Sequence, residues 1–312
     1  MHRRLCLGRV PILLFHTVRT RGAPMEGPRG ELSLEADVFA RGLASLRAGG
    51  YRSIRCRELH DHLAHGAPLP PRPILLTFDD GWLDNWTVAA PLLAQHGFGA
   101  TLFVATDLLD VAGDARGVRP ALAAGREGSA DATEIEQQGY LRPCELQALA
   151  AQGVFEIEAH SASHAVLDRT TTPWTWFGQR GPGEDEAAQC ARIAADLERC
   201  KARFVELLGR APEFLAWPGG GASRAGLDVA RAAGFRATFL TDEWAHEVAP
   251  GPDAIPRAFF SQYWRGPGAD RARVWKMRGV ADWESGAWHG YVRLFVANRW
   301  MGFARRWRRS SR

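Results

Sequence analysis

The sequence lacks the features of a disulfide-linked, membrane-spanning or secreted protein. Its five cysteines are odd in number and include no C-x-x-C pair, which favours a reducing compartment and argues against a cysteine-bound structural zinc. No run of about 18 apolar residues occurs, so no transmembrane helix is expected. The apolar run 10–15 is too short for a signal peptide and contains Pro11. We therefore expect a cytoplasmic protein, with peripheral attachment to a membrane as the alternative.

Acidic residues are missing from the C-terminal segment, which is rich in arginine. Residues 291–312 carry seven arginines and no acid, and without those seven the formal net charge falls from +4 to −3. The body of the protein has no basic stripe with interleaved aromatics, so nucleic acid is not an expected partner. From Trp288 onward, large apolar residues recur near helical spacing between the arginines. This C-terminal tail is interpreted either as an amphipathic helix on an anionic membrane or as a terminal helix packed on the domain.

Apolar runs typical of buried parallel strands alternate with helical segments along most of the chain. The expected strands are 12–15, 74–78, 100–104, 154–157, 214–217 and 237–240, and the expected helices are 39–48, 88–96, 143–151, 186–208 and 225–233. Several of these helices end in a glycine that leads into a strand. The alternation predicts an α/β fold with a parallel sheet, open or closed into a barrel, whose chemistry lies at the C-terminal strand ends. We expect a catalytic domain over 1–270 and a Trp- and Arg-rich tail over 271–312.

Two polar clusters follow predicted strands. Asp79 and Asp80 close the strand 74–78, and burying two adjacent carboxylates is costly unless a cation compensates them. The alternative is that one of them caps the following helix. His160 and His164 follow the strand 154–157, and on one helical turn their spacing puts both rings on one face. Two histidines and one carboxylate leave a tetrahedral zinc one position short, which is typical of catalytic sites.

These residues carry a family resemblance. Thr77-Phe78-Asp79-Asp80-Gly81 and His160-Ser161-Ala162-Ser163-His164 resemble, in order and in full, the first two motifs of the polysaccharide deacetylase family, also called the NodB-homology or carbohydrate esterase family four domain. The resemblance extends over most of residues 10–260. Leu14-Phe15-His16 is similar to the start of its poly-N-acetylglucosamine deacetylase branch.

The resemblance implies a distorted (β/α)7-type barrel with helices outside and a role for each motif residue. Asp79 is then the general base, and Asp80, His160 and His164 hold a divalent metal, with Zn²⁺ as the first choice and Co²⁺, Ni²⁺ or Fe²⁺ as alternatives. The expected reaction is hydrolytic removal of an N-acyl group, acetyl first, from an amino-sugar glycan or glycolipid precursor. Expected partners are an N-acylated sugar, an oligosaccharide or a lipid-linked glycan.

The sequence departs from the family in its later motifs. The segment Ala216-Trp217-Pro218-Gly219 corresponds to the third motif and keeps its proline. Ala216 stands where the family has an arginine, and Gly219 stands where it has an aromatic residue. Pro218, Gly219 and Trp217 are kept as the substrate and oxyanion segment, because Gly219 offers the same backbone N–H.

The arginine and the general acid therefore need substitutes. Arg257, in an Ile-Pro-Arg segment that the same branch has, is expected to steady Asp79, with an ordinary surface arginine as the alternative. No L-x-H motif follows, so His16 is expected to be the general acid, with His246 in reserve and Asp242 beside Trp244 as a weak match to another family element.

Tryptophans provide candidate sugar contacts, with packing as the alternative for each. They are Trp82, Trp86, Trp174, Trp176 and Trp217. Two other functions stay open: an amidase of the same fold that acts on a small molecule, and a catalytically silent barrel that binds glycan or membrane.

Overall fold

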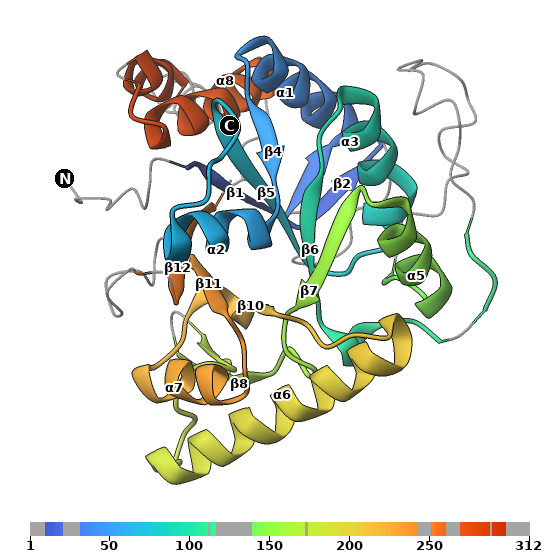
Figure 1. The fold of residues 1–312 in the computed structure, drawn as a ribbon, viewed down its shortest axis with the longest axis vertical. Coiled ribbons are helices and arrows are strands. Elements are labelled where there is room, and N and C mark those ends of the chain that lie inside the picture. Colours follow the sequence, from blue (N-terminus) through green and yellow to red (C-terminus); the bar gives the residue numbers. More distant parts are fainter. Residues whose placement is uncertain are drawn as a thin grey trace, which may run out of the picture.

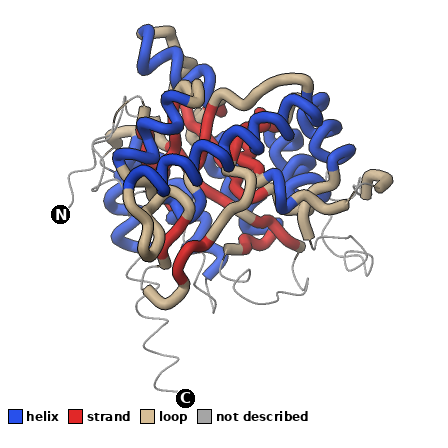
Figure 2. Tube along the Cα trace, turned by 90° about the horizontal axis from the view of Figure 1, so that it is seen from below, coloured by secondary structure: helices blue, strands red, loops and turns tan. Residues whose placement is uncertain are grey.

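The computed structural model describes residues 10–20, 32–111, 113–116, 139–171, 174–241, 251, 253–259, 269–287 and 289–297. Parallel strands form a ring surrounded by helices (Figures 1 and 2). The ring runs β1 (Ile12–Phe15), β12 (Ala254–Phe259), β11 (Ala237–Thr241), β10 (Phe214–Ala216), β7 (Phe155–Ala159), β6 (Ala100–Val104) and β5 (Pro73–Asp80), and β5 pairs with β1 to close it. β4 (Arg52–Ile54) also pairs with β5. The predicted (β/α)7-type barrel is confirmed.

The ring is distorted where β7 meets β10. These two strands share a single aligned residue pair, Leu215 with Ala159, whereas β6 and β7 align over five pairs. Two short two-stranded sheets lie outside the ring. They join β2 (Thr17–Arg19) to β3 (Ser33–Glu35) and β8 (Val166–Asp168) to β9 (Thr175–Trp176).

The helices form the outer layer. They are α1 (Ala36–Ala48), α2 (Cys56–His65), α3 (Ala90–His96), α5 (Pro143–Gln152), α6 (Glu186–Leu208), α7 (Arg224–Ala232) and α8 (Ala269–Glu284), with a π-helical turn η2 (Asn85–Ala89) and 3-10 turns η3 (Thr106–Leu108) and η5 (Pro218–Gly220). None of the described helices is long and apolar enough to cross a membrane.

Side-chain alternation along the strands separates two apolar clusters. In β5, Ile74, Leu76 and Phe78 pack under the helices, while Leu75 belongs to a smaller cluster inside the barrel with Phe103, Phe239 and Ile255. Successive strand residues face opposite sides, so Asp79 continues the inward row of Leu75 and Thr77. The alternating pattern therefore delivers an acidic side chain to the interior at the end of the strand.

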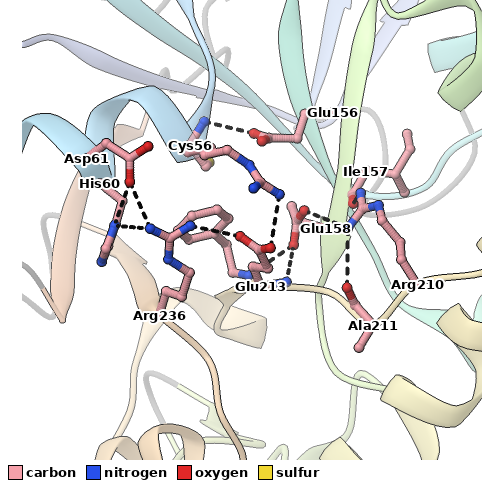
Figure 3. A network of polar contacts seen from close by, with 12 residues as sticks. Cys56, His60, Asp61, Glu156, Ile157, Glu158, Arg210, Ala211, Glu213 and Arg236 are labelled. Atoms are coloured by element: carbon pink, nitrogen blue, oxygen red, sulfur yellow. Dashed lines mark hydrogen bonds and ion pairs between the residues drawn. The ribbon is translucent and has the colours of Figure 1, made fainter. Parts of the chain in front are cut away.

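Helix α2 covers the end of the barrel where the strands begin. His60 packs against Phe214, with ring centroids 5.9 Å apart, and Asp61 accepts a 2.7 Å bond from Arg236, next to the start of β11. The backbone N–H of Cys56, the first residue of α2, donates to Glu156 of β7 at 2.8 Å. Figure 3 shows this network of charged and polar side chains between α2 and the strand starts.

Helix α8 packs against α1 (Figure 1). Met277 is buried beside Gly42, where an added Cβ would come within 2.4 Å of its sulfur. The sequence-based boundary at residue 270 thus falls inside a helix that is packed on the barrel. Residues 289–297 are helical as well.

Candidate metal centre

Asp79 and Asp80 end β5, and both are buried. In a regular strand Asp80 would face the helices, opposite to Asp79. Asp80 instead has φ of +76°, a left-handed conformation that costs a non-glycine residue roughly 1–2 kcal/mol. This break in the alternation lets both carboxylates approach His160, whose Nε2 lies 3.3 Å from Asp80 Oδ1 and 3.8 Å from Asp79 Oδ2.

His160 and His164 lie on the loop after β7. The expectation of a helical turn between them is wrong, because residues 160–165 are not helical and both Ser161 (φ +63°) and His164 (φ +51°) are left-handed. The loop still brings the two rings together, with centroids 5.0 Å apart. The Ser161 hydroxyl accepts a 3.0 Å bond from the backbone N–H of His164 and so holds the tight turn.

The side chains of Asp80, His160 and His164 converge on one point. Asp80 Oδ1 lies 3.3 Å from Nε2 of His160 and 3.2 Å from Nε2 of His164. The three atoms belong to a cluster whose ligand atoms all lie within 4.8 Å of one another. Their elements and number match the three protein ligands of a catalytic zinc site.

The hydrogen bonds around these atoms fit a cation between them. Asp80 Oδ1 is buried and has no hydrogen-bond partner, although Oδ2 accepts a 2.9 Å bond from Trp82 Nε1. His160 Nδ1 lies 2.8 Å from the Ala216 carbonyl, which fixes the proton on Nδ1 and leaves the Nε2 lone pair directed at Asp80. Lone pairs that face a carboxylate oxygen repel it unless a proton or metal lies between them, so these residues fit a divalent metal.

The electrostatic interactions in the cluster favour an ionised Asp80 and a protonated His164. Burial opposes ionisation of Asp80, but His164 and His160 outweigh it and hold the pKa of this carboxyl well below its ordinary value. Burial likewise opposes protonation of His164, yet Asp80 raises the pKa of its imidazole. The site therefore has a strong preference for positive charge beside Asp80.

Arg257 binds Asp79 from inside the barrel. Its Nη1 donates to Oδ1 at 2.6 Å and its Nη2 to Oδ2 at 2.8 Å, and its side chain is 0% exposed. Burial raises the pKa of Asp79, but the Arg257 charge and its hydrogen bonds, together with His160, more than compensate and lower it. The alternative that Arg257 is an ordinary surface arginine is wrong.

His16 follows β1 at the same rim. Phe15 aligns with Phe78, so His16 is level with Asp79. Its carbonyl accepts a 2.9 Å bond from Asn85 Nδ2, which anchors the backbone there. Burial lowers the pKa of His16, and the nearby Asp80 and Asp79 carboxylates only partly offset this. The structure thus brings His16 into the field of the carboxylate pair.

The segment Trp217-Pro218-Gly219 lies beside the histidines. Gly219 has φ of +69°, and a Cβ added to it would lie 2.1 Å from the ring of Trp176, which packs edge-on against His164 at 5.5 Å. Trp217 is fully buried and stacks on Phe177. Sugar stacking by the Trp217 ring, as the sequence suggested, is therefore wrong, and the segment can contribute only through its backbone.

Two of the other four candidate tryptophans are also used for packing. Trp82 is buried and stacks on Tyr140, and Trp86 is buried with its Nε1 donating to the Arg116 carbonyl. Trp174 is 39% exposed, and its ring lies 5.9 Å from that of Trp176. The pair Trp174 and Trp176 remains as an aromatic surface beside the cluster.

Asp196, which sequence reasoning missed, holds the histidine loop. This buried residue of α6 accepts bonds from the backbone N–H groups of Ala162 at 2.7 Å and Ser163 at 3.1 Å. The available signal was an acidic residue in the apolar stripe of a helix, next to Leu197 and one turn after Ile193. Trp82 was noticed only as a possible sugar contact, although it follows Asp80 by two residues.

A second histidine cluster fits a metal less well. His60, Asp61 and His65 have ligand atoms within reach of one another, but Arg236 Nη2 lies 3.1 Å from His60 Nδ1 and 2.7 Å from Asp61 Oδ1. A guanidinium already supplies the positive charge there. The reserve acid His246, with Asp242 and Trp244, lies outside the described residues.

Comparisons with known proteins agree with this arrangement. The sequence profile of the polysaccharide deacetylase family matches residues 66–238, more than half of the chain, so the chain belongs to the polysaccharide deacetylase family. The matched range contains the Asp79–Asp80 and His160–His164 motifs but neither His16 nor Arg257. The family is metal-dependent, and the chain has a candidate Asp/His metal site.

Relatives extend the similarity beyond the profile. Poly-beta-1,6-N-acetyl-D-glucosamine N-deacetylase of Escherichia coli K12 is 22% identical over 230 residues, which cover 74% of this chain and 34% of that protein. The chain spans about a third of the length of the curated relatives it matches.

Solved structures share the fold. IcaB from Ammonifex degensii has a TM-score of 0.61 at 20% identity, over 88% of this chain and 97% of that chain. The BpsB deacetylase domain from Bordetella bronchiseptica has a TM-score of 0.56 at 25% identity, over 80% and 95%.

Proposed function

We propose that the chain is a metal-dependent hydrolase that removes N-acetyl groups from an amino-sugar glycan. The main observation in support is that two neighbouring carboxylates have different partners. Asp80 Oδ1 faces two histidine Nε2 atoms. Asp79 instead accepts hydrogen bonds on both oxygens from the buried Arg257. One carboxylate is thus arranged as a ligand and the other as an ionised base. Family membership and the poly-N-acetylglucosamine deacetylase among its relatives support the acetyl group and the glycan.

Asp80, His160 and His164 would hold the metal, and Zn²⁺ is the proposed ion because two imidazoles and one carboxylate are a ligand set of catalytic zinc sites. When bound, the ion polarises the acyl carbonyl and lowers the pKa of the attacking water. Trp82 and the Ala216 carbonyl fix the orientation of Asp80 and His160, respectively.

Asp79 is the proposed general base. It takes a proton from the attacking water, and Arg257 keeps it ionised and fixed in orientation. His16 is the proposed general acid, which gives a proton to the amine as the C–N bond breaks. Because burial lowers the pKa of His16, its imidazolium is a strong proton donor, and activity that depends on it falls as the pH rises. The backbone N–H of Gly219 is the proposed stabiliser of the oxyanion, because Pro218 has no N–H and the N–H of Trp217 donates to the Phe239 carbonyl at 3.1 Å.

Trp174 and Trp176 are the proposed sugar contacts. Aromatic rings suit the apolar faces of sugars, and Trp176 contacts the candidate ligand His164. The surface they form favours a glycan over a small amide. A lipid-linked glycan stays a prediction, as does the cytoplasmic location.

The test combines metal analysis with an activity assay. Purified chain is loaded with Zn²⁺, and free amine is measured after incubation with N-acetylglucosamine oligosaccharides. We expect an equimolar amount of zinc and amine release in the wild type, loss of both in Asp80→Asn and His160→Gln, and retention of both in His65→Gln, the matched control from the second cluster. An Asp80→Asn variant with full zinc and full activity would contradict the proposal.

The same experiment separates the alternatives. A chain that binds zinc through Asp80 and His160 but releases no amine from any oligosaccharide would favour a small-molecule amidase, tested with cyclic and linear amides. Absence of amine from every substrate would favour the silent barrel.

A further inference from the structure

The C-terminal helices expose a group of large apolar side chains. We call it the C-terminal aromatic patch, and its members are 38–57% exposed: Trp275, Trp283, Tyr291, Val292, Phe295 and Val296. The ring of Tyr291 lies 5.8 Å from that of Trp283 and 6.3 Å from that of Phe295, so α8 and the helical residues 289–297 share one surface. Exposed aromatic side chains that contact one another, such as Trp283, Tyr291 and Phe295, mark an interaction site.

Positive charge lies next to this patch. Three arginines surround the buried carboxylate of Asp282: Arg72 at 2.8 Å, Arg278 at 3.0 Å, and Arg293. One carboxylate neutralises one guanidinium, so the group keeps an excess of positive charge. Burial lowers the pKa of Arg293, and the neighbouring charge of Arg278 lowers it further.

The sequence that follows α8 is also positively charged. Residues 285–312 contain seven arginines, three tryptophans and no aspartate or glutamate. Each basic residue near an anionic lipid surface contributes about 1 kcal/mol of attraction, and tryptophan and tyrosine favour the level of the lipid headgroups. A protein partner would need a matching acidic surface, whereas an anionic bilayer matches both the charge and the aromatic residues.

We propose that the C-terminal aromatic patch docks the protein on the surface of an anionic lipid bilayer. The aromatic side chains enter the headgroup region, and the excess positive charge around Asp282 attracts the lipid phosphates. Attachment is peripheral.

The Trp283 end of the patch lies at the strand-start end of the barrel, next to Asp282. Asp282 bonds to the Tyr51 hydroxyl at 3.0 Å and to Arg72, and these two residues directly precede β4 and β5. Asp79 and Asp80 end β5, whose eight residues span about 26 Å. Docking through Trp283 and Tyr291 therefore keeps the candidate metal centre about one strand length away from this lipid contact. If the proposed deacetylase function holds, the substrate is a glycan that extends away from the bilayer and not a sugar next to a lipid headgroup.

The docking test is co-sedimentation of the full chain with vesicles. We compare phosphatidylcholine vesicles with vesicles containing one quarter phosphatidylglycerol, at low and high salt. We expect binding to the anionic vesicles, weakened by salt, and a loss of about 10-fold in the Tyr291→Ser/Phe295→Ser double variant. Val205→Ser, which alters an equally exposed apolar residue on α6, is the matched control and should bind like the wild type.

Two results would overturn the docking proposal. One is equal sedimentation of the wild type and the double variant. The other is that the wild type sediments with no vesicle, forms a dimer in light scattering, and loses this dimer in the double variant. That result would assign the patch to a second copy of the chain.

An activity assay distinguishes a failure of the docking proposal from a failure of the proposed function. The double variant should deacetylate soluble oligosaccharides at the wild-type rate, so a loss of vesicle binding with intact activity concerns docking alone. On anionic vesicles we expect faster deacetylation of long lipid-anchored oligosaccharides than of a lipid-linked N-acetylglucosamine monosaccharide. Equal rates would overturn the orientation but not the docking.

Discussion

Arg257 reaches Asp79 across the interior of the barrel. β1 lies between β12 and β5 in the ring, yet both terminal nitrogens of Arg257 bind the carboxylate, at 2.6 and 2.8 Å. Ile255, two residues before Arg257, belongs to the cluster inside the barrel, so strand alternation directs Arg257 to the same side as Asp79. The third motif lost its arginine at Ala216, and a different strand supplies one.

Replacement of Arg257 by Gln should raise the pKa of Asp79. Arg257 lowers this pKa and burial raises it, so without the arginine burial prevails. A base must be ionised, so the acid limb of the pH–rate profile moves to higher pH and kcat falls about 100-fold. The pH–rate profile on oligosaccharide checks this, and an unshifted acid limb would contradict it. Arg257→Lys, which keeps the charge, should shift the limb less, and thermal melting verifies that each variant folds.

Asp196→Ala should weaken metal binding without altering a ligand. Asp196 holds the N–H groups of Ala162 and Ser163, and without these bonds the loop that carries His160 and His164 is less ordered. We expect zinc affinity to fall about 10-fold or more, as for other residues that orient metal ligands. Competition with a zinc-binding dye measures this. Asp228→Asn, an exposed change on α7, should leave the affinity unchanged.

Trp82→Phe should also weaken zinc binding, through the loss of a single hydrogen bond. The indole N–H is the donor to Asp80 Oδ2, while the ring stacks on Tyr140. Phenylalanine keeps the stacking and removes the donor, so zinc affinity should fall about 10-fold with little change in melting temperature. Unchanged zinc affinity would show that the indole bond does not orient Asp80.

Gly219→Ala should reduce activity more than stability. The added Cβ would meet the Trp176 ring, and the φ of +69° disfavours alanine. The strain falls on the segment proposed to bind the oxyanion, so kcat should fall while zinc content stays constant. Steady-state kinetics and zinc analysis check this. Gly209→Ala, with the same φ but no atom within 4 Å of the added Cβ, is the control for backbone strain alone.

Glu184→Gln should lower stability in a pH-dependent way. Hydrogen bonds from Arg192 outweigh burial and lower the pKa of Glu184 to about 2. A lowered pKa contributes stability above the unfolded value, near 4.5, and this contribution is lost as the pH falls towards 2. The melting temperature should be about 2 °C lower than wild type at pH 7, with a gap that narrows below pH 4.5. A gap independent of pH would assign the loss to packing.

The sequence predicted the strands best where every residue is buried. Expected strands 12–15 and 100–104 match β1 and β6 to the residue, because consecutive apolar residues serve both the inner and the outer cluster. The expected helix 186–208 matches α6. Asp185 caps its N-terminus, and left-handed Gly209 caps its C-terminus. Short strands such as β4 were missed, because three residues provide too little periodicity.

The site was predicted in its residues but not in its backbone. The spacing of His160 and His164 indicated a helical turn, whereas left-handed Ser161 and His164 form a loop. Side-chain hydrogen bonds from Asp196 stabilise that loop, and such long-range contacts have no local signature. The same limit applies to Arg257, whose role depends on β12 closing the ring next to β1.

Helix α2 closes the strand-start end of the barrel, and large side chains such as Phe103, Phe214 and Phe239 fill the interior behind it. Among the described residues, the open end of the barrel is thus the rim at the strand ends, where the candidate metal centre lies. In the proposed reaction, the glycan, the attacking water and both products all meet at this rim. If the proposed function holds, a long polymer lies across the rim and presents one sugar at a time, and release of acetate competes with binding of the next sugar.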